Sequence, residues 1–156
     1  MITCKFENGS NAQLRHMVTH VIALKENKIL LVKRAEGILE AGKWGLPGGF
    51  ADRNETIKQT AIREFKEETG WDCEVISLFK IISNPNRPND SGRQNIALEF
   101  LVKPLKKTGE SDWEQTEVKW WDLDEINESE MAFDHGTTIN FLKKYLKGEV
   151  EIPIFA

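Results

Sequence analysis

Cysteine, excess charge and long apolar runs are all scarce in this sequence of 156 residues. Its two cysteines, Cys4 and Cys73, lack the paired spacing of zinc sites and redox motifs, so we interpret both as buried or idle thiols. A net charge of −4 gives no general attraction to a polyanion, which argues against nucleic acid and membrane as partners. No stretch approaches the roughly 20 apolar residues of a membrane span, and the first residues lack a signal-peptide pattern. We therefore expect a cytoplasmic protein.

The composition is typical of one globular domain, and we expect that domain to span residues 1–156. Charged residues make up 29% of the sequence and hydrophobic residues 40%. A chain of this length buries a core without help from disulfides or a structural metal. We find no internal repeat, low-complexity tract or domain boundary in it.

An acidic cluster lies in the stretch Gly49–Trp71, which also carries a clear helical pattern. Glu64, Glu67 and Glu68 stand at positions i, i+3 and i+4, so a helix places their carboxylates at neighbouring positions on one side. Like charges at this spacing repel one another by roughly 0.2–0.5 kcal/mol per pair. A hard divalent cation such as Mg²⁺ takes oxygen ligands and often joins carboxylates to phosphates, so it would offset the repulsion.

The predicted helix, Glu55–Thr69, begins and ends at residues suited to helix ends. Asn54 is the expected N-cap, and Glu55 lies in the first turn, where a carboxylate favours the positive end of the helix dipole. Helix initiation and catalysis are both open interpretations of Glu55. Gly70 follows the last turn, as a C-terminal glycine should.

This helix also has an apolar side and a basic residue beside its acids. We expect Arg63 to pair with Glu67, one turn further along. The helical wheel predicts a core-facing arc of Ile57, Ala61, Ile62 and Phe65.

Gly49, five residues, Glu55, seven residues and then residues 63–71, REFKEETGW, form a pattern that resembles the Nudix box. Every charged and glycine position of that motif is present at the correct spacing, and only Phe65 and Trp71 replace its aliphatic residues. The resemblance implies an α/β fold, the Nudix-type α/β/α sandwich with a central mixed β-sheet. It also implies hydrolysis of the pyrophosphate bond of a nucleoside diphosphate derivative with Mg²⁺, or alternatively Mn²⁺, as cofactor.

The same resemblance implies roles for individual residues. Glu64 and Glu68 would bind the metal directly, and Glu67 would do so directly or through water. The carbonyl of Gly48 would supply a further ligand, and Arg63 would orient the carboxylates.

The resemblance says less about the general base and about the contacts to the substrate phosphates. The base varies within the family, and Glu64, Glu114 and Glu117 are open alternatives here. Gly48 and Gly49 permit backbone conformations that a side chain forbids, so we expect them to let the backbone approach metal and substrate phosphates closely.

Strands are predicted on both sides of the box. Met17–Leu24 and Lys28–Lys33 are predicted to form a hairpin around a three-residue turn, and the segment before Leu14 is either a first strand or a loose tail. Further predicted elements are the strands Cys73–Ser83, Gln94–Lys103 and Glu117–Asp122 and the amphipathic helix Thr137–Lys147. We interpret His16 and His20 as structural, and Trp120 and Trp121 as core or sheet-face residues.

The loop Asn84–Arg93 is dense in turn formers, and loops of this length are often functional. Its cations, Arg87 and Arg93, suit a phosphate or the face of an adenine, although a mobile hairpin tip is the alternative. Residues 83–93, SNPNRPNDSGR, resemble the Ser-x-Pro-x-Arg…Gly-Arg loop of ADP-ribose pyrophosphatases. The sequence Phe-Asp-His at residues 133–135 resembles the sequences of the dinucleotide-cleaving branch of the family.

The resemblance therefore favours ADP-ribose as substrate, cleaved to AMP and ribose 5-phosphate. A nucleoside triphosphate pyrophosphatase, which releases NMP and pyrophosphate, is the alternative enzyme. A non-catalytic nucleotide-sensing domain is the third hypothesis, disfavoured because such a domain is expected to have lost acidic box residues. The expected partner is a small nucleotide, and a homodimer is an open alternative to a monomer.

Overall fold

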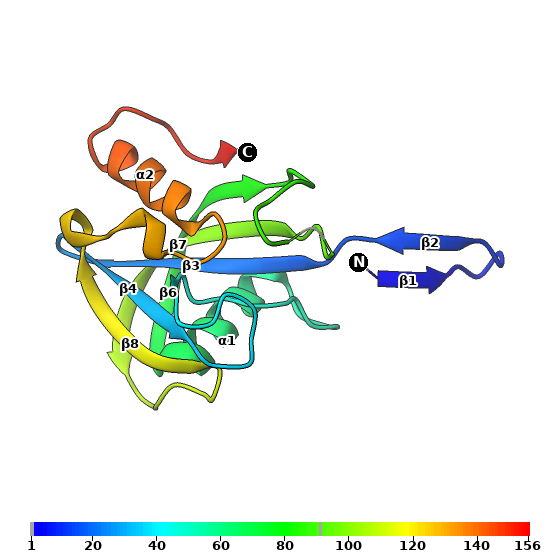
Figure 1. The fold of residues 1–156 in the computed structure, drawn as a ribbon, viewed down its shortest axis with the longest axis horizontal. Helices are drawn as coiled ribbons and strands as arrows, with labels where there is room; N and C mark the ends of the chain where they lie inside the picture. Colours follow the sequence, from blue (N-terminus) through cyan, green and yellow to red (C-terminus); the bar gives the residue numbers. More distant parts are fainter. Residues whose placement is uncertain (1, 91) are drawn as a thin grey trace.

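The computed structural model describes residues 2–90 and 92–156. They form a mixed sheet with a helix on each face, and a separate two-stranded hairpin (Figure 1). The seven-stranded sheet has the order β5-β4-β3-β7-β6-β9, with β8 paired to β4. Its strands are β3 (Met17–Lys25), β4 (Lys28–Arg34), β5 (Trp44–Gly45), β6 (Trp71–Ile82), β7 (Ile96–Lys107), β8 (Gln115–Asp122) and β9 (Ile154–Phe155). The helices are α1 (Ile57–Thr69) and α2 (His135–Leu146), with 3₁₀ turns at Leu123–Glu125 and Glu128–Glu130.

Strand β3 gives the sheet its mixed character. It pairs in parallel with β7, from Met17 opposite Ile96 to Ala23 opposite Val102, and antiparallel with β4. The side chains of β3 alternate between the two faces, as a pleated strand requires. Val21 therefore belongs to the core under α1, and Ile22 to the core under α2.

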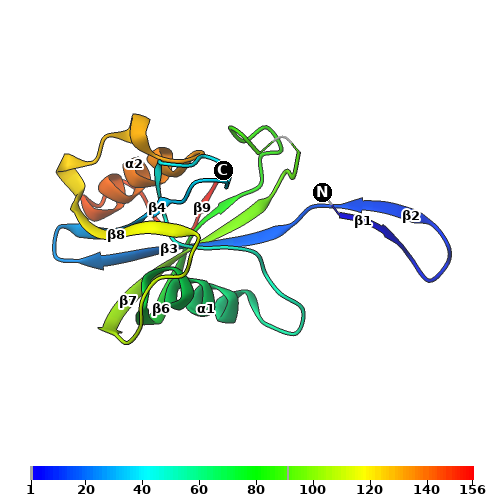
Figure 2. The same cartoon turned by 60° about the horizontal axis from the view of Figure 1, so that its bottom comes forward.

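Helices α1 and α2 cover opposite faces of this sheet, which Figure 2 shows nearly edge-on. Ala61 and Phe65 of α1 are fully buried against Leu30 and its neighbours, while Ile139 and Leu142 of α2 are fully buried on the other side. The predicted α/β/α sandwich is therefore confirmed.

Helix α1 begins later than predicted. Thr56, not Asn54, is the N-cap: its hydroxyl accepts from the Gln59 N–H, and the Gln59 side chain accepts from the Thr56 N–H in a capping box. Asn54 has φ 71°, so it belongs to the turn before the helix. Gly70 ends the helix with φ 73°, as expected, and its N–H donates to the Lys66 carbonyl over 2.8 Å.

Several other boundaries and faces differ from the sequence-based expectation. Ile62 was predicted on the apolar arc but is 37% exposed, because the buried stripe follows Ala61 and Phe65. Strand β7 starts at Ile96 rather than Gln94 and extends to Lys107, where it continues to pair with β6.

The segment before Leu14 forms two strands, β1 (Ile2–Lys5) and β2 (Asn11–Leu14), which pair with each other and project from the body (Figure 1). Cys4 and Cys73 are free and partly buried, and burial raises the pKa of the Cys73 thiol to about 11. Trp120 and Trp121 pack against the two cores, as predicted. None of the described helices is long and apolar enough to span a membrane.

Candidate active site

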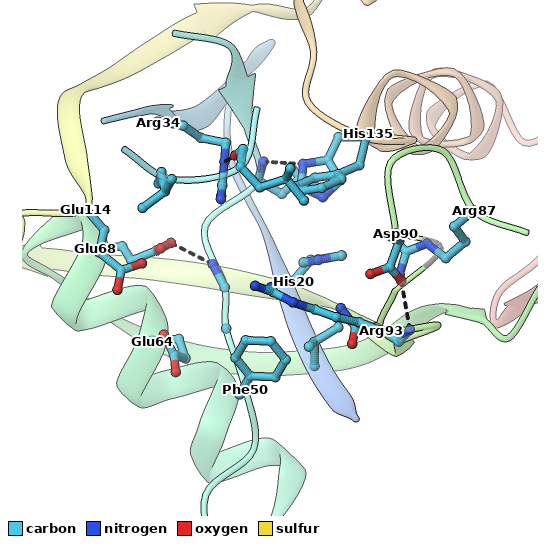
Figure 3. A pocket seen from close by; sticks show the side chains of 18 of the residues that line it. His20, Arg34, Phe50, Glu64, Glu68, Arg87, Asp90, Arg93, Glu114 and His135 are labelled. Carbon is cyan, nitrogen blue, oxygen red and sulfur yellow. Dashed lines mark hydrogen bonds between the residues drawn. The ribbon is translucent and has the colours of Figure 1, made fainter. Parts of the chain in front are cut away.

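A cavity of about 470 Å³ opens where α1, the Trp44–Phe50 segment, the loop after β6 and the start of α2 meet (Figure 3). Glu64 and Glu68 of α1 lie on one side of it, and His135, Arg87 and Asp90 lie on the other. The structure therefore joins the acidic cluster to the arginine-bearing loop in one site.

Arg63 is the centre of the charge network on α1. Its Nη1 donates to Glu64 Oε1 over 2.7 Å and to Glu67 Oε2 over 3.0 Å, so the predicted pairing with Glu67 is confirmed. Its Nη2 and Nε donate to the two oxygens of Glu55 over 2.8 and 3.1 Å. These bonds, with the N–H of Asp52, lower the pKa of Glu55 to about 2. Glu55 thus lies outside the helix and positions Arg63.

Glu68 is held in a buried position behind the glycine segment. It is 4% exposed; its Oε2 accepts from the Gly48 N–H over 2.7 Å, and its Oε1 accepts from the Gln115 amide over 2.5 Å. Burial raises the pKa of Glu68 well above its usual value and, to a smaller extent, raises the pKa of Glu64. Both carboxylates would therefore be stabilised by an added positive charge.

Gly48 and Gly49 are required by close approaches to this site. Gly48 has φ 153°, and a Cβ there would overlap the carbonyl of Thr19. A Cβ on Gly49 would overlap the carboxylate of Glu64. The absent side chain of Gly48 therefore lets this segment pack against the backbone of β3, and that of Gly49 lets it lie against Glu64.

The donor types at this wall fit a hard divalent cation, which takes carboxylate and carbonyl oxygens. Glu64 and Glu68 line the cavity, whereas the Glu67 carboxylate, 49% exposed, binds Arg63 outside the lining. In the part of the chain that is described, no three acidic, histidine or cysteine side chains converge closely enough to hold a metal ion. Glu67 would therefore have to leave Arg63 to join the other two.

The two loop carboxylates considered as general bases lie in different places. Glu114 precedes β8 and lines the cavity. Glu117 lies within β8, opposite Lys33 of β4, and its side chain is exposed outside the cavity lining. The structure does not bring Glu117 to the site, because β8 begins at Gln115 and carries it along the ladder.

The two arginines of the loop also differ. Arg87, with 5% of its side chain exposed, forms a bidentate pair with Asp134: Nε donates to Oδ2 over 2.9 Å and Nη2 to Oδ1 over 2.6 Å. The Arg93 guanidinium lies over the Phe50 ring, 5.4 Å from its centroid. Arg87 therefore shares its charge with a protein carboxylate, while Arg93 makes a weaker contact at the cavity wall.

The sequence-based reading missed several residues of the lining. Arg34 ends β4, donates from Nε to the Leu39 carbonyl over 2.7 Å and lies over the Phe133 ring, 5.3 Å from its centroid. His20, interpreted as purely structural, also lines the cavity, and its Nδ1 is 3.4 Å from Glu99 Oε1. The sequence held one signal for Arg34: it is a cation at the end of a predicted strand that leads towards the box, so it could have been predicted to line the site.

The sequence profile of the NUDIX domain matches residues 14–142, which is most of the chain. The chain therefore belongs to the Nudix family, and the resemblance carried by the box is confirmed. It is a Nudix hydrolase that acts on pyrophosphate bonds. The family generally uses a divalent metal, consistent with the oxygen donors at the acidic wall.

Individual relatives differ in substrate. The chain is 34% identical over 124 residues to an ADP-ribose pyrophosphatase of Methanocaldococcus jannaschii, a match that covers 80% of this chain and 70% of that protein. It is 31% identical over 111 residues to an 8-oxo-dGDP phosphatase of Danio rerio, which covers 69% of this chain but 32% of that protein. A Nudix hydrolase structure from Nitrosomonas europaea superimposes with a TM-score of 0.80 at 26% identity, covering 99% of this chain and 92% of that one.

Proposed function

We propose that this hydrolase cleaves ADP-ribose to AMP and ribose 5-phosphate. The observation that carries the proposal is the shared cavity: Glu64 and Glu68 lie on one side, and Arg93 of the loop that resembles ADP-ribose pyrophosphatases lines the same space. A diphosphate at the acidic wall leaves the rest of the cavity for the groups at its two ends. The archaeal relative named for ADP-ribose supports the same substrate.

We assign Mg²⁺, with Mn²⁺ as an alternative, to the oxygens of Glu64, Glu67, Glu68 and the Gly48 carbonyl. When bound, the cation neutralises negative charge on the diphosphate and favours attack by water. Arg63 orients Glu64 through its Nη1 contact, while Glu67 would exchange its own Nη1 contact for the cation. The Gly48 N–H donates to Glu68 Oε2 and so holds the carboxylate of Glu68 in place.

The reaction breaks one P–O bond of the diphosphate bridge. The oxygen of a water molecule bonds to one phosphorus, and the bridging oxygen leaves with the other phosphate. A cavity carboxylate accepts the proton of the water, and Glu64 and Glu114 both line the cavity. Because Glu117 lies outside that lining, Glu114 replaces it as the loop candidate for the base.

Chromatographic identification of products tests the substrate. The protein is incubated in three separate reactions, each with Mg²⁺ and one of the candidate substrates: ADP-ribose, a nucleoside triphosphate or 8-oxo-dGDP. AMP and ribose 5-phosphate as the fastest-formed products are expected. Faster release of NMP and pyrophosphate from the triphosphate would support the alternative enzyme, and faster turnover of 8-oxo-dGDP would place the chain with the Danio rerio relative. Nucleotide binding without turnover of any of the three would favour a sensing domain.

A further inference from the structure

Phe50 presents an aromatic ring to the cavity directly after the glycine segment. It follows Gly49, where a Cβ would overlap the Glu64 carboxylate, and Figure 3 shows its ring on the Glu64 side of the cavity. Phe50 is 40% exposed and lines the cavity. Phe6 and Phe155 are exposed as well, but neither belongs to the cavity lining. The exposed area of Phe50 is therefore part of the site.

The backbone contacts of Phe50 hold this ring in a fixed place relative to the acidic wall. Phe50 forms an antiparallel bridge with Val18 of β3. Its carbonyl accepts a hydrogen bond from Arg63 Nη2 over 3.1 Å. Because Nη1 of the same arginine donates to Glu64, the aromatic residue and the carboxylate assigned to the metal share one anchor. A group held at that carboxylate therefore meets the Phe50 ring in a defined position.

Arg93 brings a cation to the same ring. Its guanidinium carbon lies 5.4 Å from the Phe50 ring centroid, and the His16 ring meets Phe50 edge-to-face with centroids 5.2 Å apart. Within residues 2–90 and 92–156 the Arg93 side chain forms no hydrogen bond or ion pair, whereas Arg87 is paired with Asp134. Arginine stacks on planar π systems and also binds phosphate. Phe50 and Arg93 therefore form a stacking surface that carries a positive charge.

We propose that Phe50 is a specificity-determining residue whose ring stacks on the nucleobase of the substrate, with the Arg93 guanidinium beside the stacked pair. The inference rests on the proposed function, in which the diphosphate lies at Glu64 and Glu68. One ribose separates the base of a nucleotide from its phosphate, so the base stacks close to the wall that holds the diphosphate. Base–aromatic stacking is favourable there because it buries the exposed face of the phenylalanine.

Stacking predicts a particular kind of selectivity. Every base has a π face, so a phenylalanine reads the size of the ring system and not the donors and acceptors at its edge. Purines bury more apolar area than pyrimidines. We therefore expect AMP and GMP to bind more tightly than CMP and UMP, with little difference between adenine and guanine at this contact.

Phe133 offers a competing aromatic surface in the same cavity lining. The Arg34 guanidinium lies 5.3 Å from its ring centroid, and its ring lies 5.8 Å from that of His135. His135 lies across the cavity from Glu64, so a base on Phe133 would lie on the side of α2. Substitution of each phenylalanine in turn decides between the two surfaces.

The test is calorimetric titration of the wild type and its variants with AMP and, separately, with ribose 5-phosphate, in the presence of Mg²⁺. Neither ligand contains a diphosphate, so neither is cleaved. Phe50→Leu keeps an apolar side chain but loses the aromatic face, and should weaken AMP binding roughly three- to tenfold. Its affinity for ribose 5-phosphate should stay within about twofold of the wild type, because that ligand has no base. Phe50→Tyr keeps the ring and should bind AMP within about twofold of the wild type.

Two further leucine substitutions complete the comparison. Phe6→Leu changes a similarly exposed ring on the projecting hairpin and should alter the binding of neither ligand. Phe133→Leu changes the competing surface, and a loss of AMP binding in this variant but not in Phe50→Leu would place the base beside α2 and overturn the proposal. A lower melting temperature of Phe50→Leu with equal losses for AMP and ribose 5-phosphate would assign Phe50 a structural role instead.

The outcomes distinguish this inference from the proposed function. Equal AMP binding by Phe50→Leu and the wild type, or a loss that falls on ribose 5-phosphate alone, overturns the role of Phe50 and leaves ADP-ribose cleavage standing. If the wild type binds 8-oxo-dGMP but not AMP, and Phe50→Leu weakens that binding, Phe50 stacks on the base but ADP-ribose is the wrong substrate. If the wild type binds none of these ligands and cleaves none of the candidate substrates, both proposals fail.

A nuclear magnetic resonance experiment checks the stacking directly. The ring protons of the adenine in bound AMP should show nuclear Overhauser effects to the ring protons of Phe50. They should also shift upfield, because the ring current of a stacked phenylalanine shields them, and this shift should shrink in Phe50→Leu. Overhauser effects from Phe50 to the ribose protons alone, or to no proton of AMP, would contradict the assignment.

Discussion

The two walls of the cavity are built in different ways. On the α1 wall, Arg63 binds partners that are one, four and eight residues away in sequence, all within the box. The opposite wall depends on pairs far apart in the chain: Arg87 with Asp134 across 47 residues, and Leu46 with His135 across 89. Apart from the bond of Glu68 to Gln115, which spans 47 residues, the α1 wall is held by contacts within the box, so it can be recognised as a motif and suits chemistry shared by a family. A wall assembled by the fold can change its residues one at a time, which suits substrate choice.

Glu68→Gln should produce the largest effect and shows how far the α1 wall controls the rate. The substitution removes the charge that we assign to the metal at nearly constant volume, and the Gly48 N–H still finds an oxygen acceptor. We expect kcat to fall by roughly 10²–10³, by analogy with the loss of an electrostatic stabiliser, while the fold stays intact. Steady-state kinetics at saturating Mg²⁺, with a titration of Mg²⁺ binding, measure this. A near-native rate would remove Glu68 from the metal site.

Glu114→Gln tests the carboxylate that the loop before β8 adds to the site, and Glu117→Gln is its matched control. If Glu114 accepts the proton of the water, kcat should fall by about 10², the lower range for general base catalysis. Glu117→Gln should leave kcat unchanged, because its side chain is exposed outside the cavity lining. The reverse ranking would show that β8 moves relative to the cavity during turnover.

Substitution of the two loop arginines should affect different properties. Arg93→Ala removes a cavity-lining cation that we assign to the substrate, so KM for ADP-ribose should rise about tenfold with kcat nearly unchanged. Arg87→Ala leaves the Asp134 carboxylate unpaired in a largely buried site, and should lower the free energy of unfolding by roughly 3 kcal/mol. Kinetics and denaturant unfolding of both variants separate the two. Equal KM effects with no loss of stability in Arg87→Ala would mean that the Asp134 pair is not maintained in solution.

The smallest effect concerns pH and the Glu55–Arg63 pair. The pKa of Glu55 is lowered to about 2 in the folded protein from 4.5, so the charged form stabilises the fold above pH 4.5. That contribution is lost as pH falls from about 4.5 towards 2. Glu55→Gln should therefore be less stable than the wild type at pH 7, and the difference should shrink below pH 4.5. Urea unfolding at pH 7, 4.5 and 3 measures it, and a difference independent of pH would rule out the charge as its cause.

The sequence predicted what depends on spacing along one element. The pairing of Arg63 with Glu67 and the end of α1 at Gly70 follow from helical periodicity and from glycine chemistry, and both are confirmed. The start of α1 was wrong by two residues, because Asn54 and Thr56 are both good N-caps and only the turn geometry selects Thr56.

The rest of the site depends on register and on long-range pairing. Glu114 and Glu117 are three residues apart, and only the point where β8 joins β4 decides which one faces the cavity. The sequence favoured a functional loop over a mobile hairpin tip, but the pairing of Arg87 with Asp134 requires knowing where α2 begins. No local pattern contains that information.

The capping of α1 at both ends also has a consequence for heat inactivation. The capping box at Thr56, the Gly70 terminus and the buried Phe65 leave no short segment of this helix that can unfold while the core remains intact. The carboxylates should therefore keep their positions until the domain melts as a whole. Residual activity after a heat step and circular dichroism should then share one midpoint, and a sample that has lost its activity on warming has lost its fold.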